Sequence, residues 1–161
     1  MTKGMYDIIV IGCGSGGLSI GLFIGKAGFK VLMVDKTDKH IGGECLNDGC
    51  VPSKALIHVA RIAHNAQAAS HFGVALTGKI DIQKAIQYVY DKQSIIRVHE
   101  NAALLREQDI DVALGEAHFT GKNEIEVDRK RCYGKKIVIA TGSKPRRLEI
   151  PGVEKVRYYD N

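Results

Sequence analysis

The first 35 residues alternate between apolar runs and a turn rich in glycine. Residues 6–11 form a β-branched run without polar alternation, which predicts a strand buried on both faces, as in a parallel sheet. Residues 12–17 predict a tight turn, residues 18–27 a buried helix that ends at Gly28, and residues 30–35 a second strand that closes with an acid. This order predicts a βαβ unit.

Beyond this unit the pattern predicts two long helices and a small antiparallel β insert. The helices are expected over residues 51–72 and 82–106, and the insert over residues 112–139 with turns at 121–123 and 133–134. The residues expected on the apolar side of the first helix are Leu56, Val59, Ala60, Ala63 and Ala66. The sequence therefore predicts an α/β fold, with a parallel sheet that carries helices on both faces.

Residues 8–25 carry no charge, a length that invites comparison with a membrane span. Six glycines interrupt the run, so a strand, a turn and a buried helix explain it better. The 161 residues, 45% hydrophobic and 25% charged, are typical of one soluble globular domain. The net charge of +5 favours an anionic partner, either nucleic acid or a phosphate-bearing cofactor.

The glycine turn carries the spacing G-x-G-x-x-G at Gly12, Gly14 and Gly17. Such glycines permit a tight turn, a close approach to a pyrophosphate and close packing of helix on strand, and the helix N-terminus favours phosphate. Asp35 at the end of the second strand can accept hydrogen bonds from a ribose. We expect a Rossmann-like dinucleotide fold; the motif alone does not separate NAD from FAD, and a glycine turn without ligand is the alternative.

A second motif, GGECLNDGCVPSK at residues 42–54, contains Cys45 and Cys50. In a continuous helix their Cα atoms would lie more than about 7 Å apart, too far for a disulfide. The pattern thus predicts an irregular turn at 47–49 and a regular helix from about Cys50, where Pro52 is tolerated. The helix N-terminus and Lys54 favour a thiolate at Cys50, and Cys45 is expected at the exposed end of the turn. A zinc site, a structural disulfide and two ordinary reduced cysteines remain alternatives.

The two motifs, together with IVIATGSKP at residues 137–145, resemble the pyridine nucleotide–disulfide oxidoreductases, the flavoprotein family of dihydrolipoamide dehydrogenase, glutathione reductase and mercuric reductase. The resemblance implies that Cys45 is the thiol that exchanges with substrate. It implies that Cys50 is the charge-transfer thiol beside the flavin and that Lys54 lies near the flavin. The FAD-binding residues it implies are Gly12, Gly14, Ser15, Gly16, Gly17, Asp35, Lys36, Gly43, Glu44, Cys45, Lys54, Ala117, Ala140, Thr141 and Gly142.

Two positions depart from the family pattern. The family usually carries Glu where this chain has Asp35, and often Thr where it has Glu44. The shorter Asp35 must reach further, and a carboxylate at Glu44 would lie near phosphates unless it turns outward. The ending Pro52-Ser53-Lys54 resembles the dihydrolipoamide and mercuric branches more than the glutathione branch.

The resemblance implies an enzyme that carries electrons from NAD(P)H through FAD to a Cys45–Cys50 disulfide and on to a disulfide substrate such as lipoamide. Mercuric-reductase-like reduction of a metal ion, a non-catalytic nucleotide-binding module and a single-domain NAD dehydrogenase are the alternatives. Residues 1–150 are expected to form the N-terminal segment of the FAD domain, and residues 151–161 the start of a linker to an NAD(P) domain. We expect this piece alone to be inactive.

Further expectations concern partners and location. The first residues do not resemble a signal peptide, which predicts a cytoplasmic protein. The family implies a homodimer for the full-length enzyme; no bound metal, nucleic acid partner or membrane is expected. The basic residues at 129–131 and 135–136 lack an aromatic stacking platform, so we interpret them as a solvated hairpin.

Overall fold

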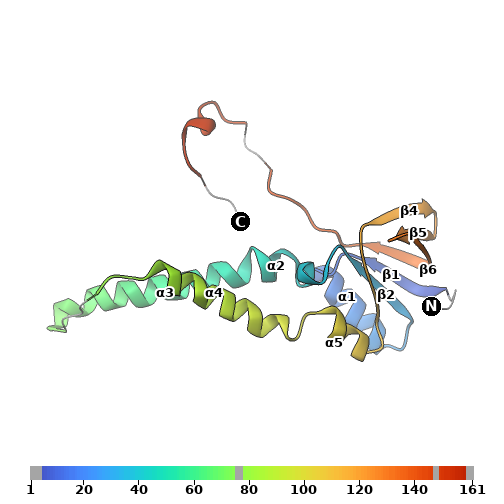
Figure 1. Cartoon of the computed structure of the whole chain (residues 1–161), viewed down its shortest axis with the longest axis horizontal. Helices are drawn as coiled ribbons and strands as arrows, with labels where there is room; N and C mark the ends of the chain where they lie inside the picture. The colour runs from blue at the N-terminus through green and yellow to red at the C-terminus, as the bar shows by residue number, and fades with distance from the viewer. Residues whose placement is uncertain (1–4, 75–77, 147–148, 159–161) are drawn as a thin grey trace.

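The computed structural model describes residues 5–74, 78–146 and 149–158, whose arrangement is shown in Figure 1. The described residues do not include residues 1–4, nor residues 159–161 of the predicted linker. The strands are β1 (Tyr6–Ile11), β2 (Val31–Asp35), β3 (Asp111–Leu114), β4 (Ala117–Gly121), β5 (Glu124–Val127) and β6 (Lys130–Ile139). The helices are α1 (Ser15–Lys26), α2 (Gly43–Asn47), α3 (Cys50–Ala68), α4 (Ile82–Arg97) and α5 (Ala102–Glu107), with 3-10 turns at Asp38–His40, Ala69–Phe72 and Val153–Lys155.

The strands of the described residues form one mixed sheet in the order β3-β2-β1-β6-β5-β4. The pairs β3–β2, β2–β1 and β1–β6 are parallel, while β6–β5 and β5–β4 are antiparallel. β1 and β2 lie in the middle of the parallel part, which agrees with the absence of alternation in their sequences. β3 joins this parallel part, so the antiparallel insert begins at Ala117 and not at Val112.

Each face of the parallel strands is covered by a different layer. On one face, α1 and α5 pack against the sheet through a cluster that includes Leu18, Met33 and Leu105. On the other face, Ile9 and Val34 pack against Ile125 of the antiparallel strands, which curl over the sheet. The predicted α/β fold with a small antiparallel insert is confirmed. Strands occupy the second face of the sheet in place of the helices expected there, because the alternating apolar side chains of β5 supply the cover.

The predicted turn at Tyr133-Gly134 is wrong, because these two residues lie inside β6. The first part of β6 pairs with β5, and from Gly134 onward the strand pairs with β1. A Cβ atom at Gly134 would lie 2.7 Å from the side chain of Ile9. Glycine is therefore required there by the close approach of β6 to β1, and not by a change of direction.

Both ends of β5 are joined to their neighbours by short turns. The predicted turn at 121–123 is confirmed between β4 and β5. The turn between β5 and β6 consists of Asp128 and Arg129, with φ angles of +48° and +60°. Positive φ at both central residues is typical of the two-residue hairpin turns whose twist matches the strands.

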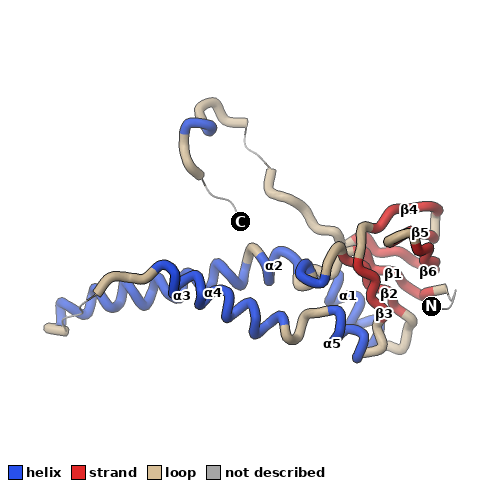
Figure 2. The backbone as a smooth tube through the Cα atoms, in the orientation of Figure 1, coloured by secondary structure: helices blue, strands red, loops and turns tan. Residues whose placement is uncertain are grey.

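α3 and α4 lie side by side and form a long hairpin that extends away from the sheet, as Figure 2 shows. The prediction of one helix over 82–106 is wrong, because α4 ends at Arg97 and α5 begins at Ala102. The side chain of Asn101 explains the break. It accepts a hydrogen bond from the N–H of Leu104 at 2.9 Å and so caps α5.

The apolar side expected for α3 is confirmed only in part. Val59, Ala63 and Ala66 are half-buried, whereas Leu56 and Ala60 are exposed and Ala55 is the buried residue. α3 packs along α4, and the ring of His58 stacks on the ring of Tyr88 of α4 with their centroids 5.7 Å apart. None of the helices in the described residues combines the length and the apolar character needed to cross a bilayer.

Candidate functional site

The glycine turn lies between β1 and α1, and backbone packs closely against it. Gly12 has a φ angle of +101°, and a Cβ atom there would overlap the carbonyl oxygen of Ala140. A Cβ atom at Gly17 would overlap the carbonyl oxygen of Gly12. These two glycines therefore permit the sharp turn and the contact of α1 with β1 that the motif predicted. Gly14 caps α1 and provides no side-chain hydrogen bond, which suits a phosphate at this helix N-terminus.

Asp35 is the last residue of β2, and its side chain contacts the glycine turn. Its carboxylate accepts a hydrogen bond from the N–H of Cys13 at 2.7 Å and another from the N–H of Lys36 at 2.7 Å. Nδ1 of His40 lies 3.8 Å from the same carboxylate. Each carboxylate oxygen has two acceptor positions, so Asp35 keeps capacity for a ribose hydroxyl while it holds the turn.

The loop after β2 returns to the glycine turn and brings two glycines into contact. The N–H of Gly42 donates to the carbonyl oxygen of Cys13 at 2.9 Å. Gly43 has a φ angle of +59°, and a Cβ atom there would lie 2.6 Å from the Cα atom of Gly14. The two segments GCGSGG and GGEC, distant in sequence, therefore form one narrow backbone cradle.

The segment that follows β6 completes this cradle. The N–H of Ala140 donates to the carbonyl oxygen of Ile11 at 2.8 Å, and the Cα atom of Thr141 approaches Gly12. Gly142 follows with a φ angle of +72°. The structure thus gathers at one edge of the parallel strands the predicted residues Gly12, Gly14, Ser15, Gly16, Gly17, Asp35, Gly43, Ala140, Thr141 and Gly142.

The two cysteines lie on either side of the junction between α2 and α3. α3 begins at Cys50, as predicted, and Asp48 and Gly49 form the turn; Asn47 belongs to α2. The N–H groups of Asp48 and Gly49 both donate to the carbonyl oxygen of Glu44, at 2.9 and 2.6 Å. This closed turn carries Cys45 back toward the first residue of α3. The side chain of Glu44 is exposed and lies beside Gly49.

The thiol of Cys45 is held by several neighbours. A hydrogen bond to Cys50, partial burial and electrostatic interactions with Cys50 and with the carboxylate of Glu100 raise the pKa of Cys45 above its ordinary value of 9.0. A hydrogen bond with the hydroxyl of Ser15 acts in the opposite direction. No disulfide joins Cys45 to Cys50 in this structure, and the hydrogen bond between them places the two sulfurs for mutual exchange. Ser15 also connects this thiol directly to the first residue of α1.

The expected order of exposure is wrong. Cys45 is half-buried, and Cys50 is exposed. The single turn of α2 folds Cys45 against Ser15, whereas Cys50 lies at the open end of α3. An open cavity of about 480 Å³ borders Cys50 and is lined also by Pro52, Ser53 and Lys54. Lys54 therefore shares a cavity with Cys50.

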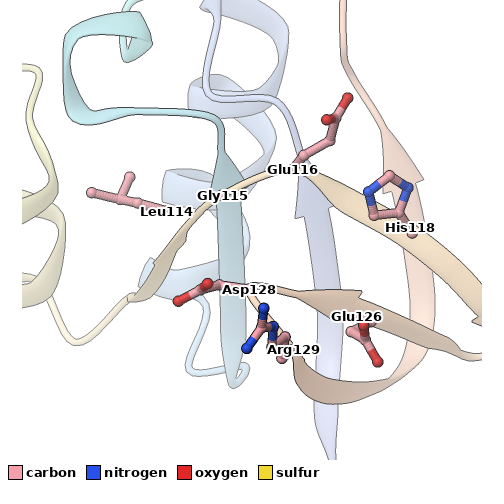
Figure 3. Close-up of a pocket in the computed structure, with 7 residues that line it drawn as sticks. All are labelled: Leu114, Gly115, Glu116, His118, Glu126, Asp128 and Arg129. Carbon is pink, nitrogen blue, oxygen red and sulfur yellow. The ribbon is translucent and has the colours of Figure 1, made fainter.

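Ala117 lies in β4, an edge strand of the sheet, and Lys36 is connected to the residue before it. Ala117 pairs with Val127 in the antiparallel strands, and Nζ of Lys36 lies 3.7 Å from a carboxylate oxygen of Glu116. An open cavity of about 360 Å³ adjoins them, and Figure 3 shows the side chains around it. Its lining consists of Leu114, Gly115, Glu116, His118, Glu126, Asp128 and Arg129. This lining contains neither Cys45 nor Cys50.

Sequence reasoning did not identify Gln93 and Arg97 of α4, which contact the cysteine segment. Nε2 of Gln93 donates to the carbonyl oxygens of Leu46 and Asn47, at 2.9 and 2.8 Å. Arg97 donates to the carbonyl oxygen of Lys39 and to the side chain of Asn47. No local motif marks either residue, because about 50 positions separate them from the segment that they hold. Within the three described ranges, no three histidine, cysteine or acidic side chains group as metal ligands.

Comparisons with known proteins place this geometry in a family. Residues 6–161 match the family described as "Pyridine nucleotide-disulphide oxidoreductase". The chain is 35% identical to a dihydrolipoyl dehydrogenase of Thermus scotoductus, over 89% of this chain and 31% of the relative. It is 33% identical to a mercuric reductase of Staphylococcus aureus, over 96% of this chain and 28% of the relative.

A solved structure is similar as well. The HOCl-induced flavoprotein disulfide reductase RclA from Escherichia coli aligns with a TM-score of 0.71 at 29% sequence identity, covering 92% of this chain and 31% of that chain. The chain thus spans about a third of the length of these relatives. A family match over nearly all residues, which includes both the glycine cradle and the dithiol turn, establishes that the chain belongs to the pyridine nucleotide-disulphide oxidoreductase family.

Proposed function

We propose that this chain is the FAD-binding N-terminal part of a flavin-dependent disulfide oxidoreductase, which carries electrons from NAD(P)H to a disulfide substrate such as lipoamide. The observation that carries the proposal is the position of the Cys45 thiol. It contacts Cys50 at the start of a 19-residue helix and also contacts Ser15 of the glycine cradle. A dithiol and a dinucleotide cradle that share a contact suit electron transfer between a bound cofactor and the two sulfurs.

The residues of the cradle fit FAD. Gly12 and Gly17 have no room for a Cβ atom and so allow the sharp turn, whereas Gly16 leaves open space at the first turn of α1, whose N-terminus could hold a pyrophosphate. Asp35 would hold the adenosine ribose, and Thr141 and Gly142 would lie close to the cofactor. Lys36 and Ala117 would contribute at the adenine end. When bound, FAD would supply a group that accepts a hydride from NAD(P)H and passes on two electrons.

The chemistry of the chain's own residues is thiol–disulfide exchange. In the reduced protein, the sulfur of Cys45 attacks one sulfur of the substrate disulfide and forms a mixed disulfide, and the first substrate thiolate leaves. The sulfur of Cys50 then attacks Cys45, so that the Cys45–Cys50 disulfide forms and the second substrate thiolate leaves. The two protons of the cysteines pass to the two substrate sulfurs. Two electrons have moved from the dithiol to the substrate.

The neighbours of Cys45 determine how readily its thiol loses a proton. The pKa of Cys45 is raised chiefly because its S–H group hydrogen bonds to Cys50. Lys54 lines the same open cavity as Cys50. Cys45 accordingly requires a base before it can attack, and we propose that Cys50 is the sulfur that lies against the flavin, as in the family.

Reduction of a metal ion is a second candidate function. Mercuric reductases are among the relatives at 33% identity, a value similar to those of the dihydrolipoyl dehydrogenases. Two adjacent thiols also suit a soft metal ion as substrate. A non-catalytic module that binds a nucleotide remains the candidate from another class, and it requires no exchange at Cys45.

The proposal includes the organisation of the longer protein. Residues 1–150 belong to the FAD domain, residues 151–161 lead to an NAD(P)-binding domain, and the full-length enzyme is a cytoplasmic homodimer. The relatives are about three times as long as the matched segment. We accordingly propose that the 161-residue chain alone does not turn over substrate.

Turnover of the full-length protein tests the function. With NADH and lipoamide, the unchanged enzyme and a Cys132→Ser variant are expected to oxidise NADH, because Cys132 lies on β6 away from the dithiol. Cys45→Ser is expected to reduce lipoamide at least about a thousandfold more slowly, since it lacks the attacking sulfur. Turnover with mercuric ion but not with lipoamide would favour the second candidate function. Equal lipoamide turnover by Cys45→Ser would refute dithiol chemistry.

A further inference from the structure

Helix α4 contacts the dithiol segment through side chains that no part of the exchange chemistry uses. Its residues Gln93 and Arg97 are half-buried and face the loop that runs from the 3-10 turn at Asp38–His40 through α2. This loop carries Cys45. In Figure 1, α4 lies alongside α2 at the base of the helical hairpin.

Gln93 binds the end of α2. The last carbonyl groups of a helix have no partner within the helix. The two N–H groups of the Gln93 amide donate to the carbonyl oxygens of Leu46 and Asn47, at 2.9 and 2.8 Å. Because Leu46 directly follows Cys45, these bonds fix the backbone one residue beyond the thiol.

Arg97 connects the two ends of the same loop. One arm of its guanidinium donates to the carbonyl oxygen of Lys39 at 2.9 Å, and the other donates to Oδ1 of Asn47 at 2.6 Å. The amide nitrogen of Asn47 in turn donates to the carbonyl oxygen of Gly43 at 2.9 Å. The planar fork of arginine suits such a double contact, which lysine could not reproduce.

The break between α4 and α5 adds one more anchor. The carboxylate of Asp38 accepts a hydrogen bond from the N–H of Ala102, the first residue of α5, at 2.7 Å. The loop is therefore attached to α4 or α5 at both of its ends. α3 begins only three residues after α2, so a fixed α2 also fixes the separation of the two thiols.

We propose that Gln93 and Arg97 are positioning residues that hold Cys45 at exchange distance from Cys50 and thereby favour the disulfide over the dithiol. The inference rests on the proposed function, because it assumes that the two sulfurs form a bond. The physical reason is the effective concentration of one thiol near the other. A loop held at both ends loses little freedom when the disulfide closes, whereas a loose loop must be ordered first.

The exchange equilibrium with glutathione measures this concentration without any cofactor. One glutathione disulfide takes two electrons and two protons from Cys45 and Cys50; it becomes two glutathione molecules while the two cysteines become one disulfide. The reduced 161-residue chain is equilibrated with mixtures of both glutathione forms, and acid stops the exchange. Mass spectrometry after digestion then gives the fraction in which Cys45 is linked to Cys50.

Two variants and two matched controls carry the test. Gln93→Met keeps the length of the side chain but donates no hydrogen bond, and Arg97→Lys keeps the charge but not the fork. Gln87→Met removes a hydrogen bond to Asp91 within α4. Arg106→Lys removes a bond to the carbonyl oxygen of Val112 at the end of α5. Neither control residue touches the dithiol segment.

We expect the equilibrium constant for disulfide formation to fall about tenfold in Gln93→Met and about three- to tenfold in Arg97→Lys. Both controls should stay within about twofold of the unchanged chain. Circular dichroism selects a temperature at which each variant is folded, so a general loss of stability does not enter the comparison. If Gln93→Met does not fold, Arg97→Lys decides alone.

Two results would overturn the proposal, and only one of them would also refute the proposed function. The first result is an equilibrium constant for disulfide formation that lies within twofold of the Gln87→Met control in both Gln93→Met and Arg97→Lys. It would refute the positioning role and leave the proposed function intact. Failure of the unchanged chain to link Cys45 to Cys50 at any glutathione ratio would refute the positioning role together with the proposed dithiol chemistry.

Discussion

A Cβ atom at Gly17 would overlap the carbonyl oxygen of Gly12, while a Cβ atom at the neighbouring Gly16 would meet nothing within 4 Å. Adjacent glycines in one motif therefore have different physical roles. Gly17 allows α1 to begin directly against the turn that follows β1. Gly16 leaves open space at the first turn of α1, where a bound phosphate would lie.

Substitution of the two glycines by alanine should give opposite results. Gly17→Ala must displace backbone, so we expect a loss of about 3 kcal/mol or more in the free energy of unfolding. Gly16→Ala lies in a helix with open space, and we expect a change between zero and a gain of about 0.5 kcal/mol. Urea unfolding followed by circular dichroism measures both. Similar losses in the two variants would show that α1 does not pack on the turn in this way.

Gly43 should tolerate alanine less well than another glycine with positive φ. Gly43 combines a φ angle of +59° with a close contact to Gly14, whereas Gly73 has a φ angle of +78° and open surroundings. We expect Gly73→Ala to lose about 1 kcal/mol of unfolding free energy, the cost of the left-handed backbone alone. Gly43→Ala should lose at least about 1 kcal/mol more. Equal losses, measured by urea unfolding, would argue against the narrow cradle.

Asp35 should contribute to stability even without a bound nucleotide, because its carboxylate accepts the N–H groups of Cys13 and Lys36. Asp35→Ala leaves both donors without this partner, and we expect a loss of about 2–3 kcal/mol in unfolding free energy. Asp35→Asn keeps one acceptor oxygen and should lose about half as much. The two variants are compared by urea unfolding. Unchanged stability in Asp35→Ala would contradict the described hydrogen bonds.

The reactivity of Cys45 should depend on Glu100. The pKa of Cys45 is raised above 9.0, first by the hydrogen bond to Cys50 and also by the negative charge of Glu100. Removal of that charge by Glu100→Gln favours the thiolate, so the pKa of Cys45 should fall. Initial alkylation of Cys45 by iodoacetamide at about pH 8 should become about two- to threefold faster.

A matched substitution provides the control for that experiment. Glu107→Gln removes a carboxylate from the exposed end of α5, and Glu107 is not among the groups that shift the pKa of Cys45. Peptide mapping after brief alkylation gives the rate at Cys45 from about pH 7 to 10. A Cys45 profile in Glu100→Gln that coincides with the profile in Glu107→Gln would show that Glu100 does not act on this thiol.

The βαβ unit could be predicted because its determinants are local. The run at 6–11, the glycine spacing and the acid at Asp35 each specify one step of the chain, and the structure places β1, α1 and β2 accordingly. The determinants of the helix start at Cys50 are also local, since Gly49 and Pro52 restrict where a helix can begin.

The wrong predictions concern features that depend on distant contacts. The sequence suggests a turn at Gly134, but glycine is needed there because the side chain of Ile9 on the neighbouring strand leaves no room for a Cβ atom. The break before α5 depends on Asn101, which is an ordinary helix residue by pattern and becomes a cap through its bond to Leu104. The contacts of Gln93 with α2 could not be read from spacing, because they form only after α4 has folded back along α3.

The central claim is that Cys45 and Cys50 form a redox pair beside a flavin cradle. Mass spectrometry of the purified chain after non-reducing digestion, with an absorbance spectrum for flavin on the same sample, tests it most directly. The account predicts a peptide pair linked through Cys45 and Cys50, whether or not the chain retains FAD. Two thiols that remain unlinked under mild oxidant would contradict the account and would favour a module that only binds a nucleotide.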